Sequence, residues 1–146
     1  MNDMTAHSDY ALITGASAGL GAEFARQLAA ARHNLILVAR REDRLSALAD
    51  ELRAAHEIDC QIIVADLNEP EAAAQIRSTC VSSGWQVSWL VNNAGVAGPD
   101  LLKDRDWAAQ QTFFQLMMLS VADLCHRMIP DMVEGGYGRV INVASV

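Results

Sequence analysis

The chain has 146 residues, of which 51% are hydrophobic and 20% are charged, and its formal net charge is −7 at pH 7. The length predicts a single domain over residues 1–146, with enough apolar content for a buried core. The negative charge argues against nucleic acid and against an anionic membrane surface as partners, because both bind basic faces.

Three cysteines, Cys60, Cys80 and Cys125, are widely separated and form no C-x-x-C pair or Cys/His cluster. We interpret them as reduced thiols, and we expect no metal site. No apolar run reaches the roughly 18 residues that span a membrane. The polar N-terminus lacks the basic and apolar regions of a signal peptide, so we expect a cytoplasmic protein.

Apolar segments of strand length alternate with segments of helical periodicity along the chain. In chain order they predict a strand at 10–14, a helix at 20–31, a strand at 35–38, a helix at 41–56, a strand at 61–64, a helix from about 68 to 82, a strand at 87–91, a helix at 106–128 and a strand at 139–144. Most of the strands are continuously apolar, which is typical of a parallel sheet with helices on both faces. The pattern predicts an α/β fold with a Rossmann-like, doubly wound parallel sheet.

A glycine-rich turn, Thr-Gly-Ala-Ser-Ala-Gly-Leu-Gly, follows the first predicted strand. Gly15 allows a sharp turn, Gly19 lets the backbone approach a pyrophosphate, and Gly21 lets the next helix pack closely on the sheet. That helix directs unpaired N–H groups at the phosphates. The alternative is an ordinary loop, in which glycines are common. The residues that we expect at this phosphate site are Thr14, Gly15, Ser17, Gly19, Leu20 and Gly21.

These motifs resemble those of the short-chain dehydrogenase/reductase family. Its cofactor turn reads Thr-Gly-x-x-x-Gly-x-Gly, and positions 14–21 match at every fixed residue. A second family motif, Asn-Asn-Ala-Gly, stands at positions 92–95, and the resemblance extends over residues 10–146. It implies the sheet order 3-2-1-4-5-6-7, of which this chain would hold about five strands in the order 3-2-1-4-5. It also implies hydride transfer between a nicotinamide cofactor and a small carbonyl or alcohol substrate.

Two arginines, Arg40 and Arg41, follow the second predicted strand. A carboxylate here would bind the ribose of NAD, whereas arginine binds the 2′-phosphate of NADP. The resemblance points the same way, so we expect NADP rather than NAD, with Arg40 the first choice and Arg41 the second. The alternative is a solvated helix start, because positions 41–44 are a mixed run of charges.

Two further turns border the cofactor in the implied fold. By resemblance, Asp66 and the backbone of Leu67 edge the adenine ring, although this segment also reads as a turn or cap before a helix. The turn Asn92–Gly95 follows the fourth predicted strand, at the edge where open α/β sheets bind ligands. By resemblance, it stabilises the sheet and borders the cofactor ribose through Asn93, Ala94 and Gly95.

The resemblance implies a catalytic tyrosine, a lysine that lowers its pKa, a substrate-orienting serine and a helix asparagine. Ser145 falls at the serine position. The tyrosines are Tyr10 and Tyr137 and the single lysine is Lys103, so the sequence holds no Tyr-x-x-x-Lys. We therefore expect this chain alone to be inactive. A non-catalytic NADP-binding module and an inactive relic remain alternatives.

The predicted helix at 106–128, with a capped entrance at Asp106, contains no asparagine. Depending on the alignment, Met117 or Ser120 takes the family position, and the Met117/Met118 pair reads as core packing. By resemblance, this helix forms much of a dimer interface. The fifth strand would be a bare edge, so we expect self-association through the helix and this strand.

Overall fold

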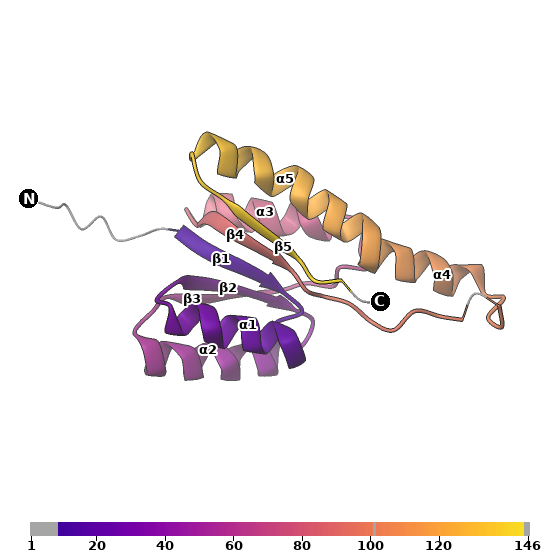
Figure 1. The fold of residues 1–146 in the computed structure, drawn as a ribbon, viewed down its shortest axis with the longest axis horizontal. Helices are drawn as coiled ribbons and strands as arrows, with labels where there is room; N and C mark the ends of the chain where they lie inside the picture. Colours follow the sequence, from indigo (N-terminus) through magenta and orange to yellow (C-terminus); the bar gives the residue numbers. More distant parts are fainter. Residues whose placement is uncertain (1–8, 101, 145–146) are drawn as a thin grey trace, which may run out of the picture.

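The computed structural model describes residues 9–100 and 102–144, in which strands and helices alternate (Figure 1). The strands are β1 (Asp9–Thr14), β2 (Asn34–Ala39), β3 (Cys60–Val64), β4 (Gln86–Asn92) and β5 (Arg139–Asn142). The helices are α1 (Gly19–Ala30), α2 (Glu42–His56), α3 (Ala72–Ser82), α4 (Trp107–Phe114) and α5 (Ser120–Glu134). A π-helical segment, η1 (Gln115–Leu119), joins α4 to α5.

Within the described residues, the strands form one parallel sheet in the order β3-β2-β1-β4-β5. This confirms the predicted doubly wound sheet and its strand order. The chain first winds outward from β1 to β3 and then crosses back to β4. The direction of winding therefore reverses between β1 and β4, which is where ligands bind in sheets of this kind.

Helices cover both faces of the sheet. Helices α1 and α2 lie on one face, and α3 and α5 lie on the other (Figure 1). Alternate residues of β1 serve the two cores: Ala11 and Ile13 pack toward α1 and α2, whereas Leu12 packs with α3 and α5. Burial on both sides explains why the strands are apolar at successive positions instead of alternating.

The long helix differs from its prediction. The sequence predicts one helix over 106–128, but the structure runs to Glu134 and contains the π-helical turn. A one-residue expansion of this kind shifts the apolar stripe around the helix, but a short run of residue types does not show where the shift occurs. It also rotates the side chains around it: Met117 is half-buried, whereas Met118 is 60% exposed, so core packing was wrong for Met118. The predicted cap at Asp106 is confirmed, because its carboxylate accepts the Ala108 N–H.

The predicted helix at 68–82 begins later, at Ala72. The Asn68 side chain donates to the Asp66 carboxylate, and the chain makes a turn before α3 starts. The proline and glutamate after Asn68 therefore belong to this turn and not to the helix.

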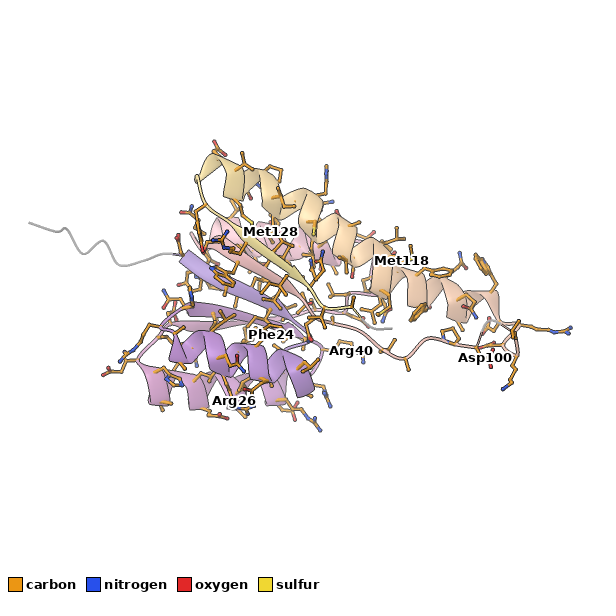
Figure 2. All side chains as sticks on the ribbon, viewed as in Figure 1. Phe24, Arg26, Arg40, Asp100, Met118 and Met128 are labelled. Atoms are coloured by element: carbon orange, nitrogen blue, oxygen red, sulfur yellow. The ribbon has the colours of Figure 1, made fainter. Side chains whose placement is uncertain are left out.

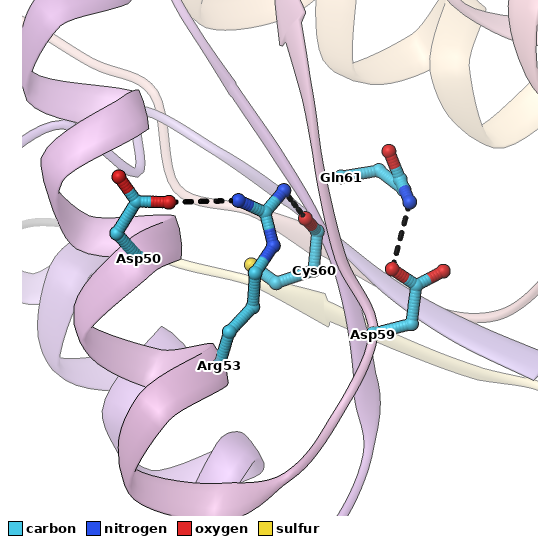
Figure 3. A network of polar contacts seen from close by, with 5 residues as sticks. All are labelled: Asp50, Arg53, Asp59, Cys60 and Gln61. Carbon is cyan, nitrogen blue, oxygen red and sulfur yellow. Dashed lines mark hydrogen bonds and ion pairs between the residues drawn. The ribbon is translucent and has the colours of Figure 1, made fainter.

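Polar contacts fix the amino-terminal end of the sheet, away from the switch point (Figure 3). Arg53 of α2 pairs with Asp50 at 2.9 Å and donates to the carbonyl of Cys60. Asp59 accepts from Gln61 at 2.7 Å and from the hydroxyl of Tyr10. These contacts tie α2, β3 and β1 together at one end, which leaves the other end open for a ligand.

No helix in the described part of the chain combines the length and the apolar character needed to cross a membrane.

Candidate functional site

A cavity of about 770 Å³ lies at the carboxyl-terminal edge of the sheet. Four connections build most of its wall: the turn after β1, the end of β2, the residues after β3 and the loop after β4. One side of α4 and η1 closes it. Eleven of the expected residues line it: Gly15, Ser17, Gly19, Leu20, Arg40, Arg41, Asp66, Leu67, Asn93, Ala94 and Gly95.

The start of α1 faces this cavity without a side-chain cap. Ala18 is the N-cap residue and has no polar side chain, and the first turn carries no acidic residue. Because the first N–H groups of a helix have no partner within the helix, these donors can bind an anion in the cavity. The macrodipole adds positive potential at the same place.

The glycines of the first turn serve different purposes. Gly15 and Gly19 have φ values of 65° and 55°, in the region that L-residues with side chains rarely adopt. At Gly21 the constraint is space, because a Cβ there would lie 2.3 Å from the carbonyl oxygen of Gly15 and 2.5 Å from Asn93 Nδ2. Gly21 thus lets α1 begin directly against the two turns that form the cavity.

Thr14 and Asn93 join these two turns. The buried Thr14 Oγ1 accepts the N–H groups of Asn93 and Ala94, each at 3.0 Å. In return, Asn93 Nδ2 donates to the carbonyl oxygens of Thr14 and Gly15, at 3.1 and 3.4 Å. Thr14 and Gly21 do not line the cavity, so their part is to hold its shape.

A cationic pair marks the end of β2. Arg40 and Arg41 are both exposed and both line the cavity. Arg41 Nη2 donates to Ser17 Oγ at 3.1 Å and so bridges the end of β2 to the turn after β1. An anion bound here would meet a guanidinium and a hydroxyl that are already side by side. Figure 2 shows Arg40 beside the carboxyl-terminal ends of the strands.

The residues after β3 combine a turn with a wall of the cavity. The Asp66 carboxylate accepts the backbone and side-chain N–H groups of Asn68, both at 3.0 Å. The Leu67 side chain is buried in the core with α3 and α5, so its backbone is the part that can meet a ligand. Asp66 thus forms the turn before α3 and also lines the cavity, while its place beside an adenine ring stays a prediction.

The long helix approaches the turn after β4 through Met117. A Cβ at Gly95 would lie 3.2 Å from the Met117 sulfur. Ser120 is buried, and its hydroxyl donates to the carbonyl of Leu116 at 2.6 Å. The hydroxyl of Ser120 is therefore engaged within the helix, and the side chain that meets the turn is an apolar thioether.

Asn92 ties β5 to this edge of the sheet. Its Nδ2 donates to Asn142 Oδ1 at 2.8 Å, and its carbonyl oxygen accepts the N–H of Val143 at 3.0 Å. Ser145, the expected catalytic serine, lies outside the described residues.

Part of the wall was missed by reasoning from the sequence. One side of the long helix lines the cavity, and its members recur at helical spacing: Ala109, Thr112, Phe113 and Leu116. The loop after β4 adds residues 96–99. The spacing was visible in the sequence, but nothing in it indicated that this side faces the ligand edge and not the core.

Comparison with known proteins agrees with this geometry. The short chain dehydrogenase family matches residues 9–146. Sulfoacetaldehyde reductase 2 from Chromohalobacter salexigens is 35% identical over 141 residues, which are 95% of this chain and 55% of that protein. A 7beta-hydroxysteroid dehydrogenase from Collinsella aerofaciens is 25% identical over 146 residues, or 55% of its length.

Solved structures give the same result. A short-chain dehydrogenase from Sphingobium yanoikuyae in complex with NADPH has a TM-score of 0.86 and 32% identity, over 94% of this chain and 54% of that one. L-sorbose reductase from Gluconobacter frateurii, complexed with NADPH and L-sorbose, has a TM-score of 0.87 and 29% identity, over 94% and 52%. This chain thus spans about half the length of the proteins that it matches. On its sequence and its fold, the chain belongs to the short-chain dehydrogenase family.

Proposed function

We propose that this chain provides the NADP(H)-binding half of a short-chain oxidoreductase, which transfers a hydride between nicotinamide and a small carbonyl or alcohol substrate. The observation that carries the proposal is the uncapped start of α1, which opens into a large cavity at the switch point of the sheet. Backbone donors, a glycine turn and this position together favour a dinucleotide diphosphate.

The preference for NADP over NAD rests on charge. Arg40 and Arg41 line the cavity at the end of β2, where an NAD-binding protein places a carboxylate. The hydrogen bond from Arg41 to Ser17 adds a hydroxyl donor beside the guanidinium. Similar proteins solved with NADPH support the same preference.

Cofactor titration tests this proposal. NADPH and NADH are each titrated into the 146-residue chain while the reduced nicotinamide fluorescence is followed. We expect saturable binding with a clear preference for NADPH. No binding of either cofactor at millimolar concentration would contradict a nucleotide site.

A non-catalytic nucleotide-binding module is the second candidate, and one observation favours it. The printed sequence contains no Tyr-x-x-x-Lys, the pair that supplies the acid–base group in the family. We propose that the 146-residue polypeptide binds NADPH without turning it over. Steady oxidation of NADPH with a panel of ketones and aldehydes would contradict this.

We also propose self-association of this polypeptide. Large apolar side chains are exposed along the long helix, among them Met118, Leu119 and Val133, and β5 is a mostly exposed strand at the end of the sheet. Apolar faces and unpaired strand edges of this kind favour association.

The free thiols of Cys60, Cys80 and Cys125 support a reducing, cytoplasmic location.

A further inference from the structure

A second cavity, of about 370 Å³, lies at the opposite end of the sheet from the first. Its wall comes from three segments that meet there: the carboxyl-terminal parts of α3 and α5 and the start of β4. In Figure 1, the carboxyl-terminal end of α5 lies at the same side of the molecule as the beginning of β1, where the parallel strands start. No described residue lines both cavities, so a nucleotide site does not explain the second one.

The floor of this second cavity is apolar. Cys80, Val87 and Met128 are buried in the core that α3 and α5 share with the sheet. Burial raises the pKa of the Cys80 thiol to about 11, so this thiol is neutral at physiological pH. One side is the half-buried ring of Trp85, which packs against the ring of Tyr10 at 6.0 Å between centroids. The cavity therefore offers a ligand a neutral apolar floor and an aromatic wall.

The rim carries one carboxylate that is not balanced by a cation. Arg77 of α3 donates two hydrogen bonds to Asp131 of α5, from Nε and Nη2, each at 2.9 Å. In this bidentate geometry the two charges neutralise each other. Glu134 also lines the cavity, and it makes no ion pair with any other residue that the structure describes. The lining side chains therefore leave the rim negatively charged.

Two helix ends add to this negative potential. Helix α3 ends at Ser82 and α5 at Glu134, and the glycines that follow them, Gly84 and Gly135, both line the cavity. Neither helix has a basic residue in its last turn. Because the carbonyl end of a helix carries partial negative charge, a cation is favoured there and an anion is disfavoured. The described residues hold no cluster of side chains suited to a metal ion, so the expected cation is organic.

We propose that the second cavity binds a small organic cation with an apolar body. Its ammonium group lies beside Glu134 and the two helix ends, and its apolar part covers Trp85 and Met128. An aromatic wall suits such a ligand, because a cation is attracted to the face of an indole ring. The volume falls in the usual range of small-molecule sites, roughly 300 to 1,000 Å³. This site does not depend on the proposed function, since it shares no lining residue with the first cavity.

Three probes of similar shape and different charge test the proposal. Binding of 2-phenylethylamine, which is a cation, 2-phenylethanol, which is neutral, and 3-phenylpropionate, which is an anion, is measured by calorimetry on the 146-residue chain at neutral pH. We expect the amine to bind about tenfold more tightly than the alcohol, through its contacts with the indole ring and the helix ends. The anion should not bind. Added salt should weaken amine binding and leave alcohol binding unchanged.

Three variants locate the binding. Glu134→Gln keeps the size of the side chain and removes its charge, so it should weaken amine binding about threefold, as expected for an exposed ion pair, and leave alcohol binding unchanged. Trp85→Leu removes the aromatic wall and should weaken the binding of both probes. Glu71→Gln is the matched control, because Glu71 is exposed at the other end of α3 and does not line the cavity. Melting temperatures verify that each variant is folded.

Each contrary outcome has its own meaning. Equal affinities for the amine and the alcohol, or no binding of the amine at millimolar concentration, overturn the proposal. Unchanged amine affinity in either Glu134→Gln or Trp85→Leu overturns the assignment to this cavity, and so does competition between the amine and NADPH. Amine affinity that falls as the protein concentration rises would show that a second copy of the chain covers the cavity instead. A chain that binds the amine but not NADPH leaves this site standing while the proposed function fails.

Discussion

Single side chains decide whether the two turns of the candidate site stay together. Thr14 is the sharpest example, because one buried hydroxyl accepts two backbone N–H groups from the turn after β4. Asn93 returns the contact to the turn after β1. The geometry of the glycine turn therefore depends on a residue that does not line the cavity.

Replacing Thr14 by valine should destabilise the chain and weaken NADPH binding together. Valine keeps the shape but leaves the partly buried N–H groups of Asn93 and Ala94 unpaired, and a fully buried unsatisfied group costs about 1 to 3 kcal/mol. Urea unfolding and cofactor titration measure the two effects. Thr79→Val is the control, because the Thr79 hydroxyl donates to Gln75 within its own helix and Thr79 does not line the cavity. Equal effects of the two substitutions would argue against this role of Thr14.

The arginines give a second prediction at this scale. Arg40→Ala and Arg41→Ala should each weaken NADPH binding by about tenfold or more while NADH binding stays nearly constant, because a charged hydrogen bond to phosphate contributes about 1.5 to 3 kcal/mol. Arg44→Ala is the control, since Arg44 is exposed nearby but does not line the cavity. A parallel loss of NADH binding would show that the arginines do not read the 2′-phosphate.

At the scale of elements, the sequence predicted most of what the structure contains. Apolar strands buried on both faces and amphipathic helices have periodicities that can be read directly, so the five strands were predictable. Their order was predicted only by the resemblance to a known family. The π-helical turn was not, because one extra residue in a turn preserves the apolar content. The late start of α3 was missed because Asn68 bonds to Asp66, a local competition that residue type alone does not resolve.

The same limit explains the candidate site. The spacing of glycines and arginines predicted the turns, and Gly15, Gly19 and both arginines line one cavity. The face of α4 was missed, because the side of a helix that lines a cavity looks like one that packs in a core.

The contact between Tyr10 of β1 and Asp59, which directly precedes β3, predicts a pH dependence. Burial, followed by the hydrogen bond and charge of Asp59, raises the pKa of Tyr10 from 10.0 to about 12. Because the folded state favours the neutral phenol, this stabilisation is complete below pH 10 and is lost as the pH rises through about 12.

Tyr10→Phe should therefore flatten the decline of unfolding free energy between pH 10 and pH 12. Tyr137→Phe is the control, because Tyr137 is half-exposed and belongs to no buried cluster. Burial also raises the pKa of the Cys60 and Cys80 thiols, to about 12 and about 11, so part of the alkaline decline persists in both variants. Identical pH profiles for Tyr10→Phe and the unaltered chain would contradict the assignment.

At the scale of the whole molecule, the exposed apolar side of the long helix and the edge strand β5 are two candidate interfaces between copies of the chain. Leu119→Lys places a charge on the helix, and Val140→Lys places one on β5. We expect at least one of them to shift the 146-residue chain toward monomer in size-exclusion chromatography with light scattering. Val81→Lys, an exposed valine on α3, should leave the distribution unchanged. A compact monomer for the unaltered chain at all concentrations would exclude self-association.

The alanine at the entrance of α1 has a consequence for folding. A helix that begins with Ala18 lacks the serine, threonine or aspartate that most helices use to complete their first turn. A bound diphosphate would accept the N–H groups that a capping side chain normally accepts. Binding in the cavity would therefore also complete the first turn of α1. Binding would then raise the free energy of unfolding, by an amount that grows with the logarithm of the nucleotide concentration. Amide exchange should slow first in the opening turn of α1.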